Sequence, residues 1–278
     1  MLTLGVIGLA ACGSAADTTT DRASDGRPTA MTTDAIETIV SGAEVDEPAR
    51  RVRLSEVIVF TATAAFRHGS IDAGVALIRE LGRSAGFSVE HAEDASGFTA
   101  ERLADVDVVV FLNTTGDVLD VAQQVALEEF VRSGGGWVGV HSAADTEYDW
   151  PFYGELLGNG AWFRSHPPET SPATLMVDPG VRDHPSIAHL PATFTWEDEW
   201  YAFRAHPGDG VTTLLRLDES SYDAGDSSMA DDHPISWAHA VGDGRAWYTG
   251  VGHRREIYAD PDYQAHLLGG LRWAAGDG

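Results

Sequence analysis

The segment at residues 134–145, GGGWVGVHSAAD, constrains the fold of this chain more than any other. Its central residues 137–140 have strand-forming side chains, and a polar turn that begins with His141 follows them directly. In an open α/β sheet, ligands bind at the carboxyl ends of such strands. The spacing small-x-His-x-small around His141 also resembles a nucleophile elbow in which histidine replaces the usual serine or cysteine. The segment therefore predicts a site at a sheet edge without the usual nucleophile.

Strand and helix patterns alternate regularly on both sides of this segment. The pattern predicts strands at residues 56–61, 87–92, 106–112 and 137–140, and helical segments at 70–86, 99–103 and 121–132. Residues 106–112 are almost wholly apolar, which is typical of a central strand covered on both faces. Such alternation predicts a parallel, right-handed, doubly wound sheet. Further strands are expected at 174–177, 211–217, 235–240 and 245–249, and a final helix at 261–273.

The amino-terminal region resembles the start of a bacterial lipoprotein. An apolar run at residues 1–11, too short to span a bilayer, precedes Cys12, the single cysteine of the chain. No basic residue precedes the run, so a fortuitous apolar terminus is the alternative. Residues 13–53 are rich in Ala, Thr, Ser and Asp and predict a flexible linker. We expect a signal peptide at 1–12, a linker at 13–53 and one domain at 54–278, exported and lipid-anchored at Cys12.

Mass spectrometry of the mature amino terminus tests this expectation. A chain that begins at a lipid-modified Cys12 is the expected result, because the signal is cleaved before that residue. An unmodified Met1 or Leu2 would end the lipoprotein hypothesis.

The composition is strongly acidic and bears on the partners. The formal net charge is −25, and all 18 basic residues are arginines. Such a surface repels phosphate backbones and anionic lipids, so no nucleic-acid partner is expected, and membrane contact is expected only through the lipid anchor. The sequence does not indicate an oligomeric state.

Candidate chemical groups follow several predicted strands. The loops after the first, third and fourth strands should converge at one edge, and they carry Arg67, His68, Asn113, Thr114, His141, Ser142 and Asp145. Later segments add Glu199, His233 and His253. We expect acid–base catalysis by His141, Glu199, His68 and His253. Ser142 is a poor nucleophile candidate because the glycine two positions before it is missing, and Cys12 lies outside the domain.

A metal site and a sugar cleft are two further possibilities. No HExxH or CxxC spacing is present, so a divalent metal ion would need ligands from distant segments, with His141, His166 and Glu199 as the candidates. Aromatic residues between 148 and 201 either pack in the core or form walls for a sugar, with Asp198 and Glu199 binding hydroxyls. The substrate-binding candidates are Arg67, Asn113, Thr114, Ser142, Asp145, Trp162, Trp200, Tyr201 and His233. The aromatic, proline-containing stretch after Asp145 is either a cap over the sheet edge or a packed surface loop.

Together these motifs resemble the ThuA (trehalose utilisation) family. The matching segments, in order, are VFTATAAFRHGSI (59–71), VDVVVFLNTTGD (106–117), GGGWVGVHSAAD (134–145), EDEWY (197–201), HPISW (233–237) and GRAWYTGVGH (244–253). The resemblance covers residues 54–276. It implies an α/β fold similar to class I glutamine amidotransferases, a three-layer flavodoxin-like sandwich with a mostly parallel sheet and no catalytic cysteine.

The resemblance also implies a role in carbohydrate metabolism. It points to a small sugar substrate, a 3-keto disaccharide or glycoside, processed by an isomerase, lyase or hydrolase reaction. A 3-keto group acidifies the proton at C2, so a base such as His141 or Glu199 could remove it while His68 and His253 polarise the ketone or hold an ion. The alternatives are a non-catalytic sugar-binding lipoprotein and an amidohydrolase, which the missing cysteine disfavours.

Overall fold

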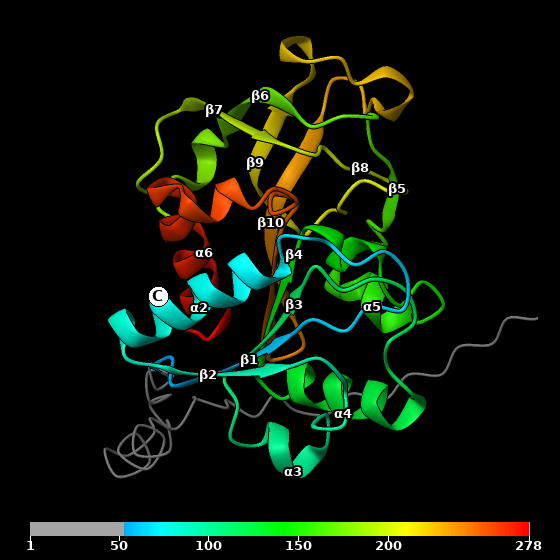
Figure 1. Ribbon diagram of the computed structural model, residues 1–278, viewed down its shortest axis with the longest axis vertical. Coiled ribbons are helices and arrows are strands. Elements are labelled where there is room, and N and C mark those ends of the chain that lie inside the picture. Colours follow the sequence, from blue (N-terminus) through cyan, green and yellow to red (C-terminus); the bar gives the residue numbers. More distant parts are fainter. Residues whose placement is uncertain (1–52, 278) are drawn as a thin grey trace, which may run out of the picture. The chain divides into compact units, whose positions relative to one another are not determined.

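The computed structural model describes residues 53–277, so the expected signal peptide and nearly all of the expected linker lie outside the described residues. The main feature of the domain is a nine-stranded sheet (Figure 1). Its strands are β1 (Glu56–Phe60), β2 (Ser88–Ala92), β3 (Val108–Leu112), β4 (Gly136–Val140), β6 (Ser171–Val177), β7 (Thr193–Asp198), β9 (Thr212–Asp218), β10 (His233–Val241) and β11 (Gly244–Thr249). A separate two-stranded sheet consists of β5 (Phe163–Ser165) and β8 (Ala202–Phe203).

Residues 53–277 also form five α-helices and five short 3₁₀ turns, and the last of each follows β11. The α-helices are α2 (Ile71–Ala85), α3 (Ala100–Leu103), α4 (Val121–Arg132), α5 (Pro151–Leu156) and α6 (Pro261–Ala274). The 3₁₀ turns are η1 (His141–Asp145), η2 (Pro179–Val181), η3 (Glu219–Ser221), η4 (Gly225–Ser227) and η5 (Glu256–Ala259). None of the helices within residues 53–277 is long and apolar enough to cross a membrane.

The large sheet is mixed, with the order β2-β1-β3-β4-β11-β10-β9-β6-β7. Neighbouring strands from β2 to β11 are parallel, as the alternating pattern predicts. From β11 to β7 every neighbouring pair is antiparallel. The change of direction follows from the tight turn between Val241 and Gly244, because strands joined by a hairpin must be antiparallel. The α/β class is therefore confirmed, with parallel pairing in one half of the sheet only.

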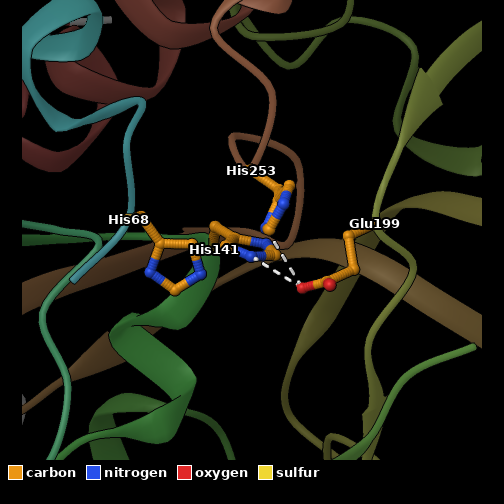
Figure 2. A group of neighbouring side chains, drawn as sticks. All are labelled: His68, His141, Glu199 and His253. Atoms are coloured by element: carbon orange, nitrogen blue, oxygen red, sulfur yellow. Dashed lines mark ion pairs between the residues drawn. The ribbon is translucent and has the colours of Figure 1, made fainter. Parts of the chain in front are cut away.

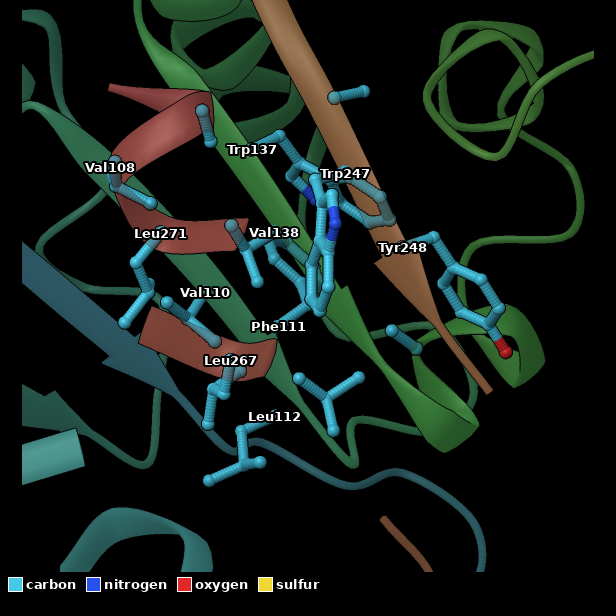
Figure 3. Close-up of a cluster of buried hydrophobic side chains, with 14 of the residues drawn as sticks. Val108, Val110, Phe111, Leu112, Trp137, Val138, Trp247, Tyr248, Leu267 and Leu271 are labelled. Atoms are coloured by element: carbon cyan, nitrogen blue, oxygen red, sulfur yellow. The ribbon is translucent and has the colours of Figure 1, made fainter. Parts of the chain in front are cut away.

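Helices cover both faces of the parallel half. Figure 3 shows Val108 and Val110 of β3 gathered with Leu267 and Leu271 of α6 on one face. On the other face, Phe111 of β3 packs against Tyr153 of α5, with ring centroids 5.5 Å apart. Residues 108–112 are all fully buried, because alternate side chains enter the two apolar layers.

The aromatic stretch after Asp145 packs against the sheet. It forms α5, whose Tyr153 is fully buried and donates a hydrogen bond to the carbonyl oxygen of Ala143 at 2.7 Å. The ring of Trp137 in β4 lies 5.7 Å from that of Tyr153. The stretch is therefore not a surface loop: α5 packs against the sheet, and Phe163 and His166 lie at the carboxyl edge beside Tyr201 and Glu199, where the capping alternative expects them.

Acid should destabilise the domain through His266 on α6. This ring is fully buried, and its Nδ1 donates a hydrogen bond to the carbonyl oxygen of Ser186 at 2.8 Å. Burial lowers the pKa of His266 from 6.5 to about 3. The unfolded chain therefore binds a proton near pH 6.5 while the folded chain does not, so the free energy of unfolding falls as the pH drops from 6.5 towards 3. Between pH 7.5 and 5.0 this residue should cost about 2 kcal/mol of stability.

Urea unfolding at these two pH values tests the prediction. The variant His266→Asn, which cannot titrate, should lose about 2 kcal/mol less than the parent protein over the same interval. His206 is exposed and is not among the groups that lower the pKa of His266, so His206→Asn serves as the control that should follow the parental pH dependence. Equal losses in the parent and in His266→Asn would contradict the assignment.

Candidate active site at the carboxyl edge of the sheet

Three imidazoles and one carboxylate meet at one edge of the sheet (Figure 2). They belong to His68, His141, Glu199 and His253, which we call the tetrad, and each offers a ligand atom within 4.8 Å of the others. His68 follows β1, His141 follows β4 and His253 follows β11. Because these three strands are parallel, their carboxyl ends lie at the same edge. Glu199 follows β7, which comes from the antiparallel half.

The backbone at His141 turns sharply, as the elbow spacing predicts. Strand β4 ends at Val140, η1 begins at His141, and His141 itself has a positive φ of 49°. A non-glycine residue in this left-handed region is uncommon and is held in place by its surroundings. The ring of Tyr201 lies 4.1 Å from the His141 ring, centroid to centroid, and fixes its orientation.

The hydrogen bonds of His141 determine which ring nitrogen is protonated. Its Nδ1 lies 2.8 Å from the carbonyl oxygen of Gly250, which can only accept, so Nδ1 carries the proton. Nε2 is then the nitrogen that faces Glu199, and it lies 3.4 Å from Oε2 of that residue. Nδ1 of His253 lies 3.2 Å from the same oxygen. Both nitrogens are buried and neither has a hydrogen-bond partner within the described residues.

Burial and mutual charge set the protonation of the tetrad. Burial, together with the neighbouring His141 and His253, lowers the pKa of His68 to about 2. Burial alone would raise the pKa of Glu199, but its interactions with His141 and His253 hold it below the ordinary value. The interaction with Glu199 raises the pKa of His253 against the effect of burial. The site thus holds an ionised carboxylate, an unprotonated His68 and one ring, His253, that protonates more readily than usual.

Asp198 connects two segments at the carboxyl edge of the sheet through buried hydrogen bonds. Its carboxylate is fully buried and accepts hydrogen bonds from the backbone N–H groups of Glu199, Gly252, His253 and Arg254 at 2.8 to 3.3 Å. Within the described residues Asp198 bonds to backbone donors, which agrees with a packing role more than with the role of binding hydroxyls in a cleft. These bonds tie the end of β7 to the loop after β11, so that Glu199 and His253 meet.

Three other expected residues lie beside the tetrad. Ser142 Oγ is 3.2 Å from Nδ1 of His68. Asn113 donates through Nδ2 to the carbonyl oxygen of Gly252 at 3.1 Å and so supports the loop of His253. His166 is more than a third exposed, and its Nδ1 lies 3.1 Å from Oε1 of Glu199. These residues position or flank the tetrad.

The remaining expected residues bond to protein groups outside the tetrad. The pairs are Arg67 with Glu93, Thr114 with Thr146, Asp145 with Tyr148, Trp162 with the Thr146 carbonyl, Trp200 with the Ser171 carbonyl, and His233 with the Tyr201 carbonyl and Glu219. Trp200 is fully buried, so it offers no face for a sugar. Tyr201 is also buried and packs on His141.

Phe66 is the exposed aromatic residue at this edge that the sequence analysis missed. Its side chain is 65% exposed, and its ring meets the His68 ring edge to face at 4.8 Å. The signal in the sequence is a large apolar residue inside the otherwise small and polar loop TATAAFRHGS. An exposed aromatic face beside a polar cluster suits the apolar side of a sugar ring.

A hollow of about 530 Å³ lies between α3, α4 and the start of β4, away from the tetrad. Its lining includes Leu103 and Phe130, with Asp107 and Glu129 as acidic groups and no histidine. Asp107 already accepts hydrogen bonds from the backbone N–H groups of residues 55 and 56. This hollow therefore lacks the groups for the expected chemistry.

The domain is similar to a known family and to solved structures. The family model for trehalose utilisation, ThuA, matches residues 56–274. A ThuA-like protein from Bacteroides uniformis is 26% identical, with a TM-score of 0.66 over 82% of this chain and 94% of its own. A ThuA-like protein from Parabacteroides merdae is 20% identical, with a TM-score of 0.65 over 80% and 90%. A β-galactosidase from Bacillus circulans, 14% identical, shares the fold over 79% of this chain and 31% of its own, with a TM-score of 0.51. No curated protein matches this chain.

Proposed function

Because this chain belongs to the ThuA family of trehalose utilisation, we propose that it is an enzyme that processes oxidised sugars at the tetrad. The substrate class is a 3-keto disaccharide or 3-keto glycoside. The observation that carries the proposal is the convergence of His68, His141, Glu199 and His253 from four separate segments at one edge of the sheet. Four ionisable groups held this close are typical of a site that moves protons.

The chemistry that the tetrad can supply matches the needs of a 3-keto sugar. Removal of the C2 proton places negative charge on the keto oxygen. The enolate then returns to the ketone while a C1–C2 double bond forms and the C1–O glycosidic bond breaks, and the departing oxygen takes up the proton that the base removed from C2. His141 Nε2 bears the lone pair that can accept the proton, and Glu199 is the second acceptor. His253, whose pKa is raised by Glu199, can donate a hydrogen bond to the developing oxyanion. An ion held by the tetrad could instead stabilise that oxyanion as a Lewis acid.

The proposal also includes the layered architecture of the domain and the location of the protein in the cell. The sharp turn with positive φ at His141 supports a flavodoxin-like, class I glutamine amidotransferase-like sandwich in which histidine stands at the nucleophile position. The apolar run before Cys12 supports export and a lipid anchor. Phe66 supports the sugar substrate, because its exposed ring lies beside His68.

The test is incubation of the purified protein with 3-keto-trehalose or a 3-keto-glucoside, with and without added divalent metal ions, followed by NMR. Conversion to an isomer, an elimination product or free sugars is the expected result. Unchanged substrate under all of these conditions would reject the enzyme. Calorimetry then separates the remaining outcomes: binding without conversion identifies a sugar-binding protein, and absence of binding rejects the substrate class.

A further inference from the structure

We propose that the tetrad binds one divalent transition-metal ion, and that zinc is the ion it fits best. The ligands are His68, His141, Glu199 and His253 (Figure 2). His166, expected from the sequence as a ligand, is not among them. Metal binding itself does not depend on the identity of the sugar substrate.

The spacing of the ligand atoms agrees with a tetrahedral site. Zinc binds imidazole nitrogens and carboxylate oxygens at about 2.0–2.2 Å, which places neighbouring ligand atoms about 3.4 Å apart. The observed separations from Oε2 of Glu199 are 3.4 Å to Nε2 of His141 and 3.2 Å to Nδ1 of His253. All four ligand atoms lie within 4.8 Å of one another, so a small inward movement completes the site.

Two buried nitrogen atoms that face Glu199 lack hydrogen-bond partners among residues 53–277. Nδ1 of His141 bonds to the carbonyl oxygen of Gly250, so Nε2 is the nitrogen directed at the carboxylate of Glu199. Nε2 of His141 and Nδ1 of His253 are both buried without a partner within the described residues, and both face Oε2 of Glu199. Buried polar atoms are normally paired, and one metal ion between these three atoms would satisfy them together.

The outer partners of the rings are those that metal-binding histidines use. A ligating histidine normally directs its second nitrogen to a carbonyl, a carboxylate or another polar group, which fixes the tautomer and the orientation of the ring. His141 has the carbonyl of Gly250, and His68 has Ser142 Oγ at 3.2 Å from Nδ1. The backbone N–H of His253 is held by the carboxylate of Asp198 at 3.0 Å.

The ligand set favours zinc over the hard cations. Calcium and magnesium prefer six or more oxygen ligands, whereas three imidazoles and one carboxylate suit zinc and its neighbours in the first transition row. His166 is unsuitable because it is partly exposed and its Nδ1 lies only 2.6 Å from the carbonyl oxygen of Pro167. On the basis of the proposed function, the ion would polarise the keto oxygen as a Lewis acid in place of His253. Nε2 of His141 would then be a ligand and not the base, so the C2 proton would pass to Oε1 of Glu199, the oxygen that does not face His141 and His253.

The experiment measures metal binding without any sugar. The protein is freed of metal with a chelator and titrated with Zn²⁺ against a competing chromogenic chelator, and Co²⁺ absorption reports the geometry. One equivalent per chain with a four- or five-coordinate Co²⁺ spectrum is the expected result. His141→Ala and His253→Ala should each weaken binding by about a hundredfold, and Ser142→Ala, which removes only the outer partner of His68, by about tenfold.

His206→Ala is the matched control, because His206 also pairs with a carboxylate, that of Asp232 at 3.1 Å, but lies outside the tetrad. It should leave the affinity and the stoichiometry unchanged. Circular dichroism of each variant checks its fold, and His253, being partly exposed, is the substitution that disturbs the core least. Absence of binding to the parent protein, or binding that survives both tetrad substitutions in a folded protein, would overturn the inference. Since no sugar is present, either result leaves the proposed function to its own test.

Discussion

Replacing Glu199 with glutamine should lower the turnover of a 3-keto glycoside by about 10²- to 10⁴-fold, the range that a positioned acid–base group contributes. Glutamine keeps the size of the side chain but removes the negative charge that lies 3.4 Å from His141 and 3.2 Å from His253. The pKa of His253 should fall towards its ordinary value, because Glu199 is the largest cause of its increase. Initial rates followed by NMR, with kcat and KM determined separately, measure the effect.

A matched control separates this effect from a general loss of carboxylate. Glu101 on α3 is exposed and far along the chain from the tetrad, and Glu101→Gln should keep the parental rate. The two glutamine variants should unfold at similar urea concentrations. A Glu199→Gln protein that remains folded and turns over substrate at the parental rate would remove Glu199 from the mechanism.

Replacing Asp198 with asparagine should lower the free energy of unfolding by about 3 kcal/mol. An asparagine oxygen can still accept the three N–H groups that now bond to Oδ1, but its NH₂ group would face the N–H of Gly252, which now bonds to Oδ2 at 2.8 Å. Two donors would then meet in a buried site, and the charge that strengthens all four bonds would be lost. Urea unfolding at neutral pH measures the change.

The same substitution should loosen the loop that carries His253, so the rate should fall even under conditions in which the protein is folded. Asp209 is exposed, and Asp209→Asn should change stability by no more than about 0.5 kcal/mol. If Asp198→Asn were as stable and as active as Asp209→Asn, the buried carboxylate would have no part in the assembly of the site.

The parallel half of the fold could be predicted from the sequence because its signals are local. The apolar run of β3, the helix of α4 and the turn after β4 each depend on a few neighbouring residues, and each lies within a residue or two of the expected position. The antiparallel half was predicted less completely. Strand β7, with the sequence TFTWED, was not predicted, although Phe194 and Trp196 alternate with polar residues in it, and its pairing with β6 depends on residues outside it.

In the candidate site, too, local sequence signals predict some residues, and tertiary contacts determine the others. His68, His141 and His253 were expected together because each follows a strand on the same edge. Glu199 could be proposed as a fourth member, but the contacts that bring it next to the histidines could not be derived. They depend on Asp198, which accepts hydrogen bonds from a loop more than fifty residues later in the chain. The solvent exposure of Phe66 and the burial of Trp200 are also products of tertiary packing, which periodicity does not encode.

The place of β11 in the sheet has a consequence for how the molecule is built. This strand comes last in the chain, yet it lies between β4 and β10 and joins the two halves. A nascent chain that ends before residue 244 therefore has two separate sets of strands with unpaired edges, and these edges are open to association with other chains. The synthesis of β11 thus decides whether one continuous sheet or an aggregation-prone intermediate results.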